Sequence, residues 1–394
     1  MTRHTRLLQF TALASTLDRF AMPPMLLAIS HDLGVPVAGV ASAAGAYFLA
    51  YGLMQPVWGL LGSRLGVVRS LRLAVLLAAL TTAGTALATD AASLVAFRLV
   101  AGAGFSAAVP AALFYAGATA APGRRHRDIT GLMAGVALGT AAATAGAGAL
   151  AATVGWRSAF LFTGTTALVA CLVLSRLPEL PAPRAAADGI FAPLRAVLRS
   201  GPARTLLLLA TVEGGILLGV LTFLPAAVGA TGSGAALAGG VTAAYGVAVL
   251  ICAPIVGRLQ QRVPAAALIA AGAALAAIGC VVAAFTATPV AGAFVCLLIG
   301  AAWASMHSTM QTWATEVVPE AGLTAVSLFA GALFTGSALA AVAGGPPVEA
   351  GRFGLVFGVA AALLLPLGVA GATARARWRP PVAVPSPVRG RDGA

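Results

Sequence analysis

The chain has 394 residues, of which 60% are hydrophobic and only 9% are charged, and its mean hydropathy is +0.96. Soluble domains carry about 25% charged and about 45–50% apolar residues, so this composition excludes an ordinary soluble enzyme. The 24 basic residues are all arginine and outnumber the 11 acidic ones, giving a net charge of +13. Whether that charge indicates nucleic acid or a membrane depends on where the arginines lie.

Membrane-spanning helices account for most of the chain. One helical crossing needs about 20 apolar residues, with a range of roughly 17–25. Uncharged windows that hold one crossing each are 33–63, 73–89, 99–123, 129–156, 158–175, 321–348 and 353–374. Two longer windows, 214–257 and 263–315, hold two crossings each, because Gly-rich 229–234 interrupts the first and Thr286 to Pro289 the second. With the stretch 7–29, and with 204–210 leading into the seventh span, the sequence predicts twelve spans. They are helices because lipid offers the backbone no hydrogen-bonding partner.

The arginines define the orientation of these spans. If the N-terminus is inside the cell, 20 of the 24 arginines lie on the cytoplasmic side and two, Arg157 and Arg352, on the other. Because cytoplasmic loops carry an excess of arginine, both termini are expected in the cytoplasm and the protein in the cell membrane. The basic residues then mark the cytoplasmic face of the membrane and attract anionic lipid. No nucleic-acid partner is expected.

The two halves of the chain repeat each other. YFLAYGLMQPVWGLLGSR (47–64) and YGVAVLICAPIVGRLQQR (245–262) share Tyr, Pro, Gly, Leu and Arg at a constant offset of 198 residues. Pro122 with Pro319, and Gly155 with Gly351, pair at nearly the same offset. Such duplication is common in transporters. The predicted organisation is a six-span bundle over residues 1–176, a cytoplasmic linker with a short amphipathic helix over 177–203, a second bundle over 204–372 and a cytoplasmic tail over 373–394.

The loop between the second and third spans resembles a family signature. GLLGSRLGVVRSLRL (59–73) is similar to the G-x-L-a-D-R-x-G-R-R loop of the major facilitator superfamily, and RLVAGAG (98–104) and GWRSAF (155–160) also resemble that family. The loop positions that fit or nearly fit are Gly59, Leu61, Arg64, Gly66 and Arg69. The resemblance implies an all-α polytopic protein of two pseudo-symmetric six-helix bundles, closest in pattern to the drug:proton antiporters. It also implies a central cavity lined by spans one, four, seven and ten.

Two departures qualify this resemblance. Ser63 stands where the signature has Asp, so a charge with which the family locks its cytoplasmic gate is missing. We therefore expect Arg64 and Arg69 to meet helix ends or lipid phosphate. Span five (131–149) has the small-residue spacing of the drug-antiporter motif but lacks its Gly-Pro pair, which weakens an assignment to drug efflux.

Charges within the spans are costly in a bilayer and are therefore the candidate proton-coupling groups. Asp18 shares one helical face with Thr11, Ser15 and Met22, and that face is expected to line the cavity. The adjacent Arg19 points about 100° away and is expected to pair elsewhere or to reach the interface.

Two further charges complete the coupling candidates. Glu213 stands at nearly the repeat-related position of Asp18, in span seven, and the resemblance assigns Arg98 as the span-four arginine. A buried carboxyl binds a proton more readily than an exposed one, as a proton carrier requires. The alternatives are a structural ion pair for Asp18, a packing role for Glu213 and an interfacial Arg98.

Polar and aromatic stripes provide the candidates for the substrate cavity. Residues on one face of spans two and ten recur at helical spacing, and Met310 accompanies the stripe on span ten. Helix packing is the alternative role for each stripe. The candidates are Ser15, Met22, Tyr47, Tyr51, Gln55, Trp303, His307 and Gln311.

Secondary active transport is the function that these features favour, and the chain is not expected to be an enzyme. It has no phosphate-binding loop and no metal-like spacing of His and Cys, so no cofactor and no metal are expected. We expect a monomer in the lipid bilayer whose partners are protons and a small-molecule substrate. The first hypothesis is proton-coupled efflux of a small lipophilic or cationic compound. The alternatives are proton-coupled uptake of a small anion or metabolite, with Arg19 and Arg98 as anion partners, and a non-transporting membrane scaffold or receptor on the same fold.

Overall fold

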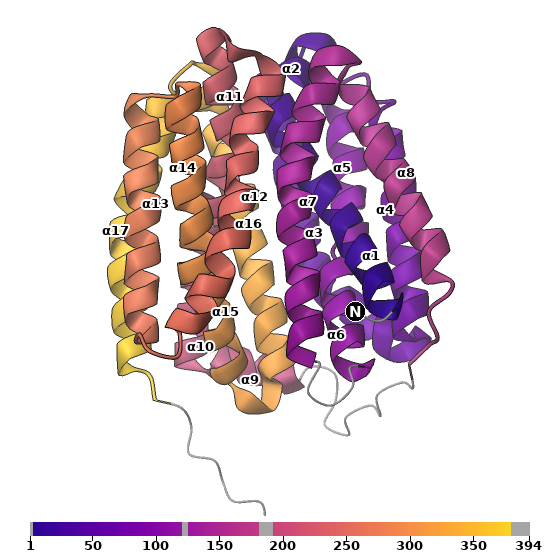
Figure 1. The fold of residues 1–394 in the computed structure, drawn as a ribbon, viewed down its shortest axis with the longest axis vertical. Helices are drawn as coiled ribbons and strands as arrows, with labels where there is room; N and C mark the ends of the chain where they lie inside the picture. Colours follow the sequence, from indigo (N-terminus) through magenta and orange to yellow (C-terminus); the bar gives the residue numbers. More distant parts are fainter. Residues whose placement is uncertain (1–2, 120–124, 181–191, 380–394) are drawn as a thin grey trace, which may run out of the picture.

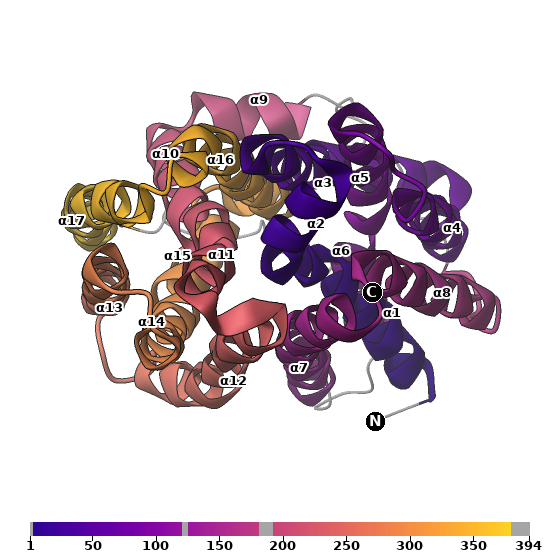
Figure 2. The same cartoon turned by 90° about the horizontal axis from the view of Figure 1, so that it is seen from above.

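Two groups of helices form the molecule. A computed structural model describes residues 3–119, 125–180 and 192–379. The first group comprises α1 (Arg3–Ala21), α2 (Leu26–Leu33), α3 (Val37–Leu65), α4 (Val67–Thr85), α5 (Ala91–Phe105), α6 (Ala108–Thr119), α7 (Arg125–Thr153) and α8 (Trp156–Leu174). The second follows the short α9 (Ala192–Arg199) and comprises α10 (Gly201–Gly214), α11 (Leu224–Val228), α12 (Gly234–Leu259), α13 (Ala265–Phe285), α14 (Pro289–Ala302), α15 (Ser308–Glu316), α16 (Gly322–Glu349) and α17 (Phe353–Arg377). The groups stand side by side, and the described residues contain no strand (Figure 1, Figure 2).

The helices confirm the predicted all-α architecture. Ten helical stretches of the described residues are long and apolar enough to cross a membrane. One of them, Gly201–Leu259, has 59 residues and bends at Gly232, whose φ of 89° lies outside the helical range, so it holds two crossings. The charged first stretch, α1 and α2, supplies the remaining crossing of the twelve.

Local sequence signals place the helix ends that position the charged residues. Pro23 and Pro24 form a short 3₁₀ turn that ends α1 soon after Asp18 and Arg19, because proline lacks the N–H that would continue the helix. Asp90 begins α5: its carboxylate accepts from the Ser93 N–H at 2.8 Å, while the Ser93 hydroxyl accepts from the Asp90 N–H at 3.3 Å. This capping box fixes the start of the helix that carries Arg98.

Small residues bring the two groups into contact along two helix pairs, α3 with α16 and α7 with α12. A Cβ on Gly52 of α3 would lie 3.0 Å from the carbonyl oxygen of Gly331 of α16. A Cβ on Gly239 of α12 would lie 2.3 Å from the carbonyl oxygen of Thr144 of α7. The halves therefore meet backbone to backbone, as small residues permit in membrane helices. We call these two contacts the glycine seam.

Two π-helical turns interrupt the spans of the second group. One, η2 (Gly215–Val220), directly follows α10, which carries Glu213. The other, η5 (Trp303–His307), joins α14 to α15. A π turn inserts an extra residue into the helix, rotates the side chains that follow, and is frequent at functional sites.

Part of the predicted organisation falls on described residues. The short amphipathic helix of the linker is present as α9, and the break between Thr286 and Pro289 separates α13 from α14. Predictions for the middle of the linker (181–191), the end of the tail (380–394) and Pro122 lie outside the described residues.

Candidate functional site

A buried ion pair joins α1 to α5. Arg98 Nη1 donates to the two carboxylate oxygens of Asp18 at 2.9 and 3.0 Å, and Arg98 Nη2 donates to the Asp18 carbonyl at 3.3 Å. The Thr163 hydroxyl on α8 donates to the same carboxylate at 3.4 Å. Both charged side chains are at most 1% exposed, and the Arg98 guanidinium lies over the rings of Tyr47 (4.3 Å) and Phe160 (5.0 Å). The negative charge of Asp18 is thus fully matched within the first half.

The face of α1 that carries Ser15, Asp18 and Met22 is buried. Ser15 is fully buried and its hydroxyl donates to the Phe105 carbonyl of α5 at 3.4 Å, next to the bond between Asp18 and Arg98. Met22 is also buried. Because this face is used by α5, the neighbouring position Arg19 points toward the second half.

Arg19 lies among aromatic rings from three helices. Its guanidinium carbon is 5.0 Å from the ring of Phe20, 5.3 Å from Tyr51 on α3 and 5.8 Å from Phe334 on α16. Its Nε is buried without a hydrogen-bond partner, and no described carboxylate lies within ion-pair distance of it. Within the described residues, Arg19 therefore has aromatic neighbours and no ion-pair partner.

The rings continue into the second half as one cluster. Tyr245 on α12 lies 6.2 Å from Phe20 and 6.5 Å from Trp303, and Trp303 stacks on His307 at 3.8 Å. Tyr51 and Phe334 lie 4.5 Å apart, and His307 lies 5.6 Å from Phe329. We call this set the central aromatic cluster; it consists of Phe20, Tyr51, Tyr245, Trp303, His307, Phe329 and Phe334.

Glu213 and His307 meet in the second half, beside the ring of Trp303. The Nδ1 atom of His307 is 3.5 Å from Oε2 of Glu213. Glu213 is fully buried, and both its carboxylate oxygens and His307 Nδ1 lack a hydrogen-bond partner. The structure thus brings together a carboxyl and an imidazole that the sequence nominated separately.

The remaining cavity candidates differ in environment. Tyr47 is buried with an unpartnered hydroxyl beside the Asp18–Arg98 pair. Gln55 is half-buried on α3, toward the end that carries the arginine-rich loops. Gln311 is exposed on α15, one helical turn after His307.

Glu179 organises the loop with the family signature, a role that no residue pattern indicated. Its carboxylate accepts from the backbone N–H groups of Val68 (2.8 Å) and Arg69 (3.0 Å) at the start of α4. Gly66, with φ 96°, leaves room for this approach, since a Cβ there would lie 2.5 Å from the carboxyl carbon.

The arginine side chains of this loop, Arg64 and Arg69, are exposed and form no ion pair with another described residue. Ser63 is also exposed, as is Gly59, and the Ser63 hydroxyl donates to the Leu60 carbonyl at 2.8 Å. Glu179 thus supplies a negative charge near the loop in which Ser63 replaces the signature Asp.

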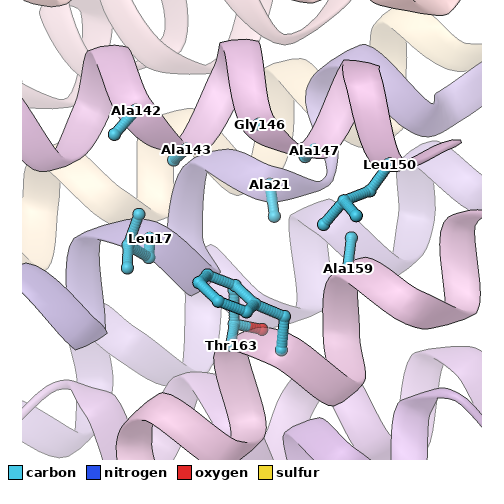
Figure 3. A pocket seen from close by; sticks show the side chains of 10 residues that line it. Leu17, Ala21, Ala142, Ala143, Gly146, Ala147, Leu150, Ala159 and Thr163 are labelled. Carbon is cyan, nitrogen blue, oxygen red and sulfur yellow. The ribbon is translucent and has the colours of Figure 1, made fainter. Parts of the chain in front are cut away.

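A small cavity lies beside the ion pair, between α1, α7 and α8 (Figure 3). Its volume is about 40 Å³, and apart from Thr163 it is lined by apolar side chains and Gly146. An apolar cavity that binds benzene has about 150 Å³. This cavity is therefore too small for an aromatic substrate, and the central aromatic cluster stays the candidate site.

Helical spans in two packed bundles, with charged and aromatic side chains between them, define a polytopic membrane protein. The model of the Major Facilitator Superfamily matches residues 8–345. The chain belongs to this superfamily, as the resemblance of the loop signature implied.

One relative resembles part of the chain. The 3-(3-hydroxy-phenyl)propionate transporter of Escherichia coli (strain K12) is 32% identical over 171 residues, which cover 39% of this chain and 42% of that protein. The match thus spans less than half of the relative's length.

Solved structures match nearly the whole chain. A point mutant of the nucleoside transporter NupG has a TM-score of 0.79 at 13% identity, covering 94% of this chain and 100% of that one. A bacterial homolog of the human lysosomal transporter Spinster has a TM-score of 0.76 at 18% identity, covering 96% and 98%. The peptide transporter PepTSo has a TM-score of 0.74 at 11% identity, covering 96% and 99%. At these identities the likeness shows the fold alone.

Proposed function

We propose that the protein imports a small aromatic carboxylate across the cell membrane together with protons. Its two bundles, 1–176 and 204–372, rock around the central aromatic cluster, and both termini lie in the cytoplasm. The carboxylate of the substrate binds Arg19, and its ring packs among the aromatic side chains. This is the anion alternative of the sequence-based hypotheses.

The unpaired charge of Arg19 is the observation that carries the proposal. Asp18, the acid that would attract a cationic compound, is already neutralised by Arg98 at 2.9 Å. Arg19 has no described partner and lies between the halves. A half-buried guanidinium without a carboxylate partner gains from a ligand that carries a carboxylate. The relative from Escherichia coli is named for an aromatic carboxylate, which agrees with this chemistry.

Proton coupling follows from the charge that the substrate carries. Moving one negative charge inward against a potential that is negative inside costs about 2.3 kcal/mol per 100 mV, and one accompanying proton cancels that cost. Asp18 is the proposed proton acceptor, because a protonated Asp18 no longer holds Arg98 and the α1–α5 contact can then rearrange.

Proton-coupled efflux of a lipophilic or cationic compound is the second candidate. The seven rings of the central aromatic cluster favour it, since aromatic faces bind lipophilic and cationic groups. A cation bound there would have to lie close to the positive charge of Arg19, which disfavours it.

Transport in proteoliposomes tests the proposal. With the lumen more alkaline than the medium, labelled 3-phenylpropionate should accumulate inside. Arg19→Gln should weaken its binding by about 10–100-fold, since a hydrogen bond to a charged group contributes about 1.5–3 kcal/mol.

The experiment also needs a control variant and a cationic compound of the same size as 3-phenylpropionate. Arg352→Gln removes an exposed arginine at the start of α17 and should leave binding unchanged. If 3-phenylpropylamine is transported out in exchange for protons and 3-phenylpropionate is not transported, the second candidate replaces the proposal.

A further inference from the structure

Glu213 and His307 form a buried pair that carboxylate binding at Arg19 leaves unused. His307 Nδ1 lies 3.5 Å from Glu213 Oε2, and these two atoms and Glu213 Oε1 have no hydrogen-bond partner. Leaving buried polar atoms unpaired is unfavourable, so such atoms call for a function. The nearby Ser337 does not satisfy Glu213, because its hydroxyl bonds the backbone carbonyls of Gly214 and Leu333 at 2.9 Å each.

The imidazole ring of His307 is held in one orientation. Trp303 stacks on it with 3.8 Å between ring centroids and 23° between the planes, and Phe329 lies 5.6 Å away. Because Nδ1 faces Glu213, the other ring nitrogen, Nε2, lies on the ring edge turned away from the carboxylate. His307 as a whole retains 6% of its surface exposed, whereas Glu213 retains none. His307 is therefore the member of the pair that a ligand can reach.

The carboxylate determines which nitrogen carries the proton. An ionised Glu213 attracts a proton on Nδ1, and a neutral imidazole then leaves a lone pair on Nε2. The contact at 3.5 Å is longer than a hydrogen bond, and such contacts commonly tighten when the ligand binds. In this state Nε2 accepts hydrogen bonds and does not donate them.

We propose that His307 Nε2 accepts a hydrogen bond from a hydroxyl on the aromatic ring of the substrate, and that Glu213 acts as a positioning residue that keeps Nε2 an acceptor. The inference rests on the proposed function, since the ring of the substrate packs in the same central aromatic cluster. It narrows the substrate class to hydroxylated aromatic acids.

Binding of a series of acids to the purified protein in detergent tests this assignment. The probes are 3-phenylpropionate and its ring-hydroxylated and ring-methoxylated derivatives at positions 3 and 4, measured by isothermal titration calorimetry. The preferred hydroxylated acid should bind about fivefold more tightly than 3-phenylpropionate and than its methoxy counterpart, the gain of one hydrogen bond.

Variants separate the positioning role from a structural one. In Glu213→Gln the amide N–H can donate to Nδ1, which moves the proton to Nε2 and makes that atom a donor. The preference for hydroxyl over methoxy should then disappear or reverse, while binding of 3-phenylpropionate stays within about twofold. His307→Phe keeps the stacked ring and should abolish the preference; it carries the test if Glu213→Gln does not fold. The matched controls Glu320→Gln and His31→Gln, at exposed positions, should keep the full preference.

The outcomes distinguish this inference from the function on which it rests. If 3-phenylpropionate binds in an Arg19-dependent manner and no hydroxylated acid binds more tightly, the inference is overturned and the proposed function stands. If Glu213→Gln keeps the full hydroxyl preference, Glu213 is not a positioning residue. If none of the acids binds the wild-type protein, the proposed function and this inference both fail.

Discussion

In the first half, the carboxylate of Asp18 accepts three hydrogen bonds from Arg98 and Thr163, whereas in the second half both carboxylate oxygens of Glu213 have no partner among the described residues. Both acids are fully buried and lie at nearly repeat-related positions, on α1 and α10. The duplicated fold thus places two carboxyls in comparable environments and provides a matching cation for only one of them.

This difference indicates which charged groups hold the structure together and which can bind a ligand. A matched buried pair is expensive to break, so it holds α1 and α5 together as long as Asp18 is ionised. The imidazole of His307, which lies beside the unmatched carboxyl, and the unmatched Arg19 stay available to a ligand. The first half holds a closed charge pair, and the groups open to substrate lie around the central aromatic cluster.

Breaking the Asp18–Arg98 pair should have the largest effect. Asp18→Asn leaves Arg98 buried without a counter-ion and should lower the free energy of unfolding by about 3–5 kcal/mol. Chemical unfolding in detergent measures this loss. Combining Asp18→Asn with Arg98→Gln should recover most of it, because no uncompensated charge remains. A loss below about 1 kcal/mol for the single variant would show that the pair is not rigidly matched.

The arginine-rich ends of the halves offer a second contrast. Glu179 holds the start of α4 through two backbone N–H groups, while the half-exposed Glu316 on α15 accepts from Arg375 of α17 at 2.9 Å. Glu179→Gln should lower the free energy of unfolding by about 1–2 kcal/mol, as the loss of a helix cap does. Arg375→Gln should cost less than about 1 kcal/mol because its partner is exposed to solvent. If Glu179→Gln and Arg375→Gln lose the same free energy of unfolding, the two ends do not differ in this way.

The opposite end of the first half should respond to acid. Hydrogen bonds from Arg157 and Trp156 lower the pKa of Asp32, which lies beyond the first span (7–29), below its ordinary value of 3.8. A lowered folded-state pKa adds stability that is present above pH 3.8 and is lost as the pH falls through the folded-state pKa. The contribution should be under about 1 kcal/mol, because the Arg157 and Asp32 side chains are 41% and 46% exposed. Thermal unfolding between about pH 6 and about pH 3 should show a smaller acid-induced loss for Asp32→Asn than for the wild type.

The same acid-to-amide change at Glu213 should have the smallest effect on stability. Glu213→Gln removes a charge that has no hydrogen-bond partner, so the free energy of unfolding should change by less than about 0.5 kcal/mol or increase slightly. Chemical unfolding of Glu213→Gln and of Asp18→Asn under the same conditions compares their free energies of unfolding directly. If Glu213→Gln is as destabilising as Asp18→Asn, the two halves bury their acids in the same way.

The sequence predicted the spans, the repeat and the family because hydropathy and loop arginines depend on composition over long windows. It also nominated Asp18, Arg98, Glu213 and His307, since charged and titratable groups are rare inside spans. It did not predict the aromatic surroundings of Arg19, because helical spacing defines a face without defining which neighbour that face meets. The π turns η2 and η5 were not predicted, because no residue pattern specifies them. The contact of Glu179 joins a linker to a loop more than 100 residues away, and only the folded chain brings them together.

The glycine seam has a consequence for the speed of the transport cycle. Where Gly52 approaches Gly331 and Gly239 approaches Thr144, the helices meet through backbone atoms. Rocking at such a contact changes few rotamers, so little conformational entropy is lost or regained as one face of the membrane closes and the other opens. A bulky residue at Gly239 would act as a wedge, holding the halves apart at one end and favouring a single orientation of the carrier.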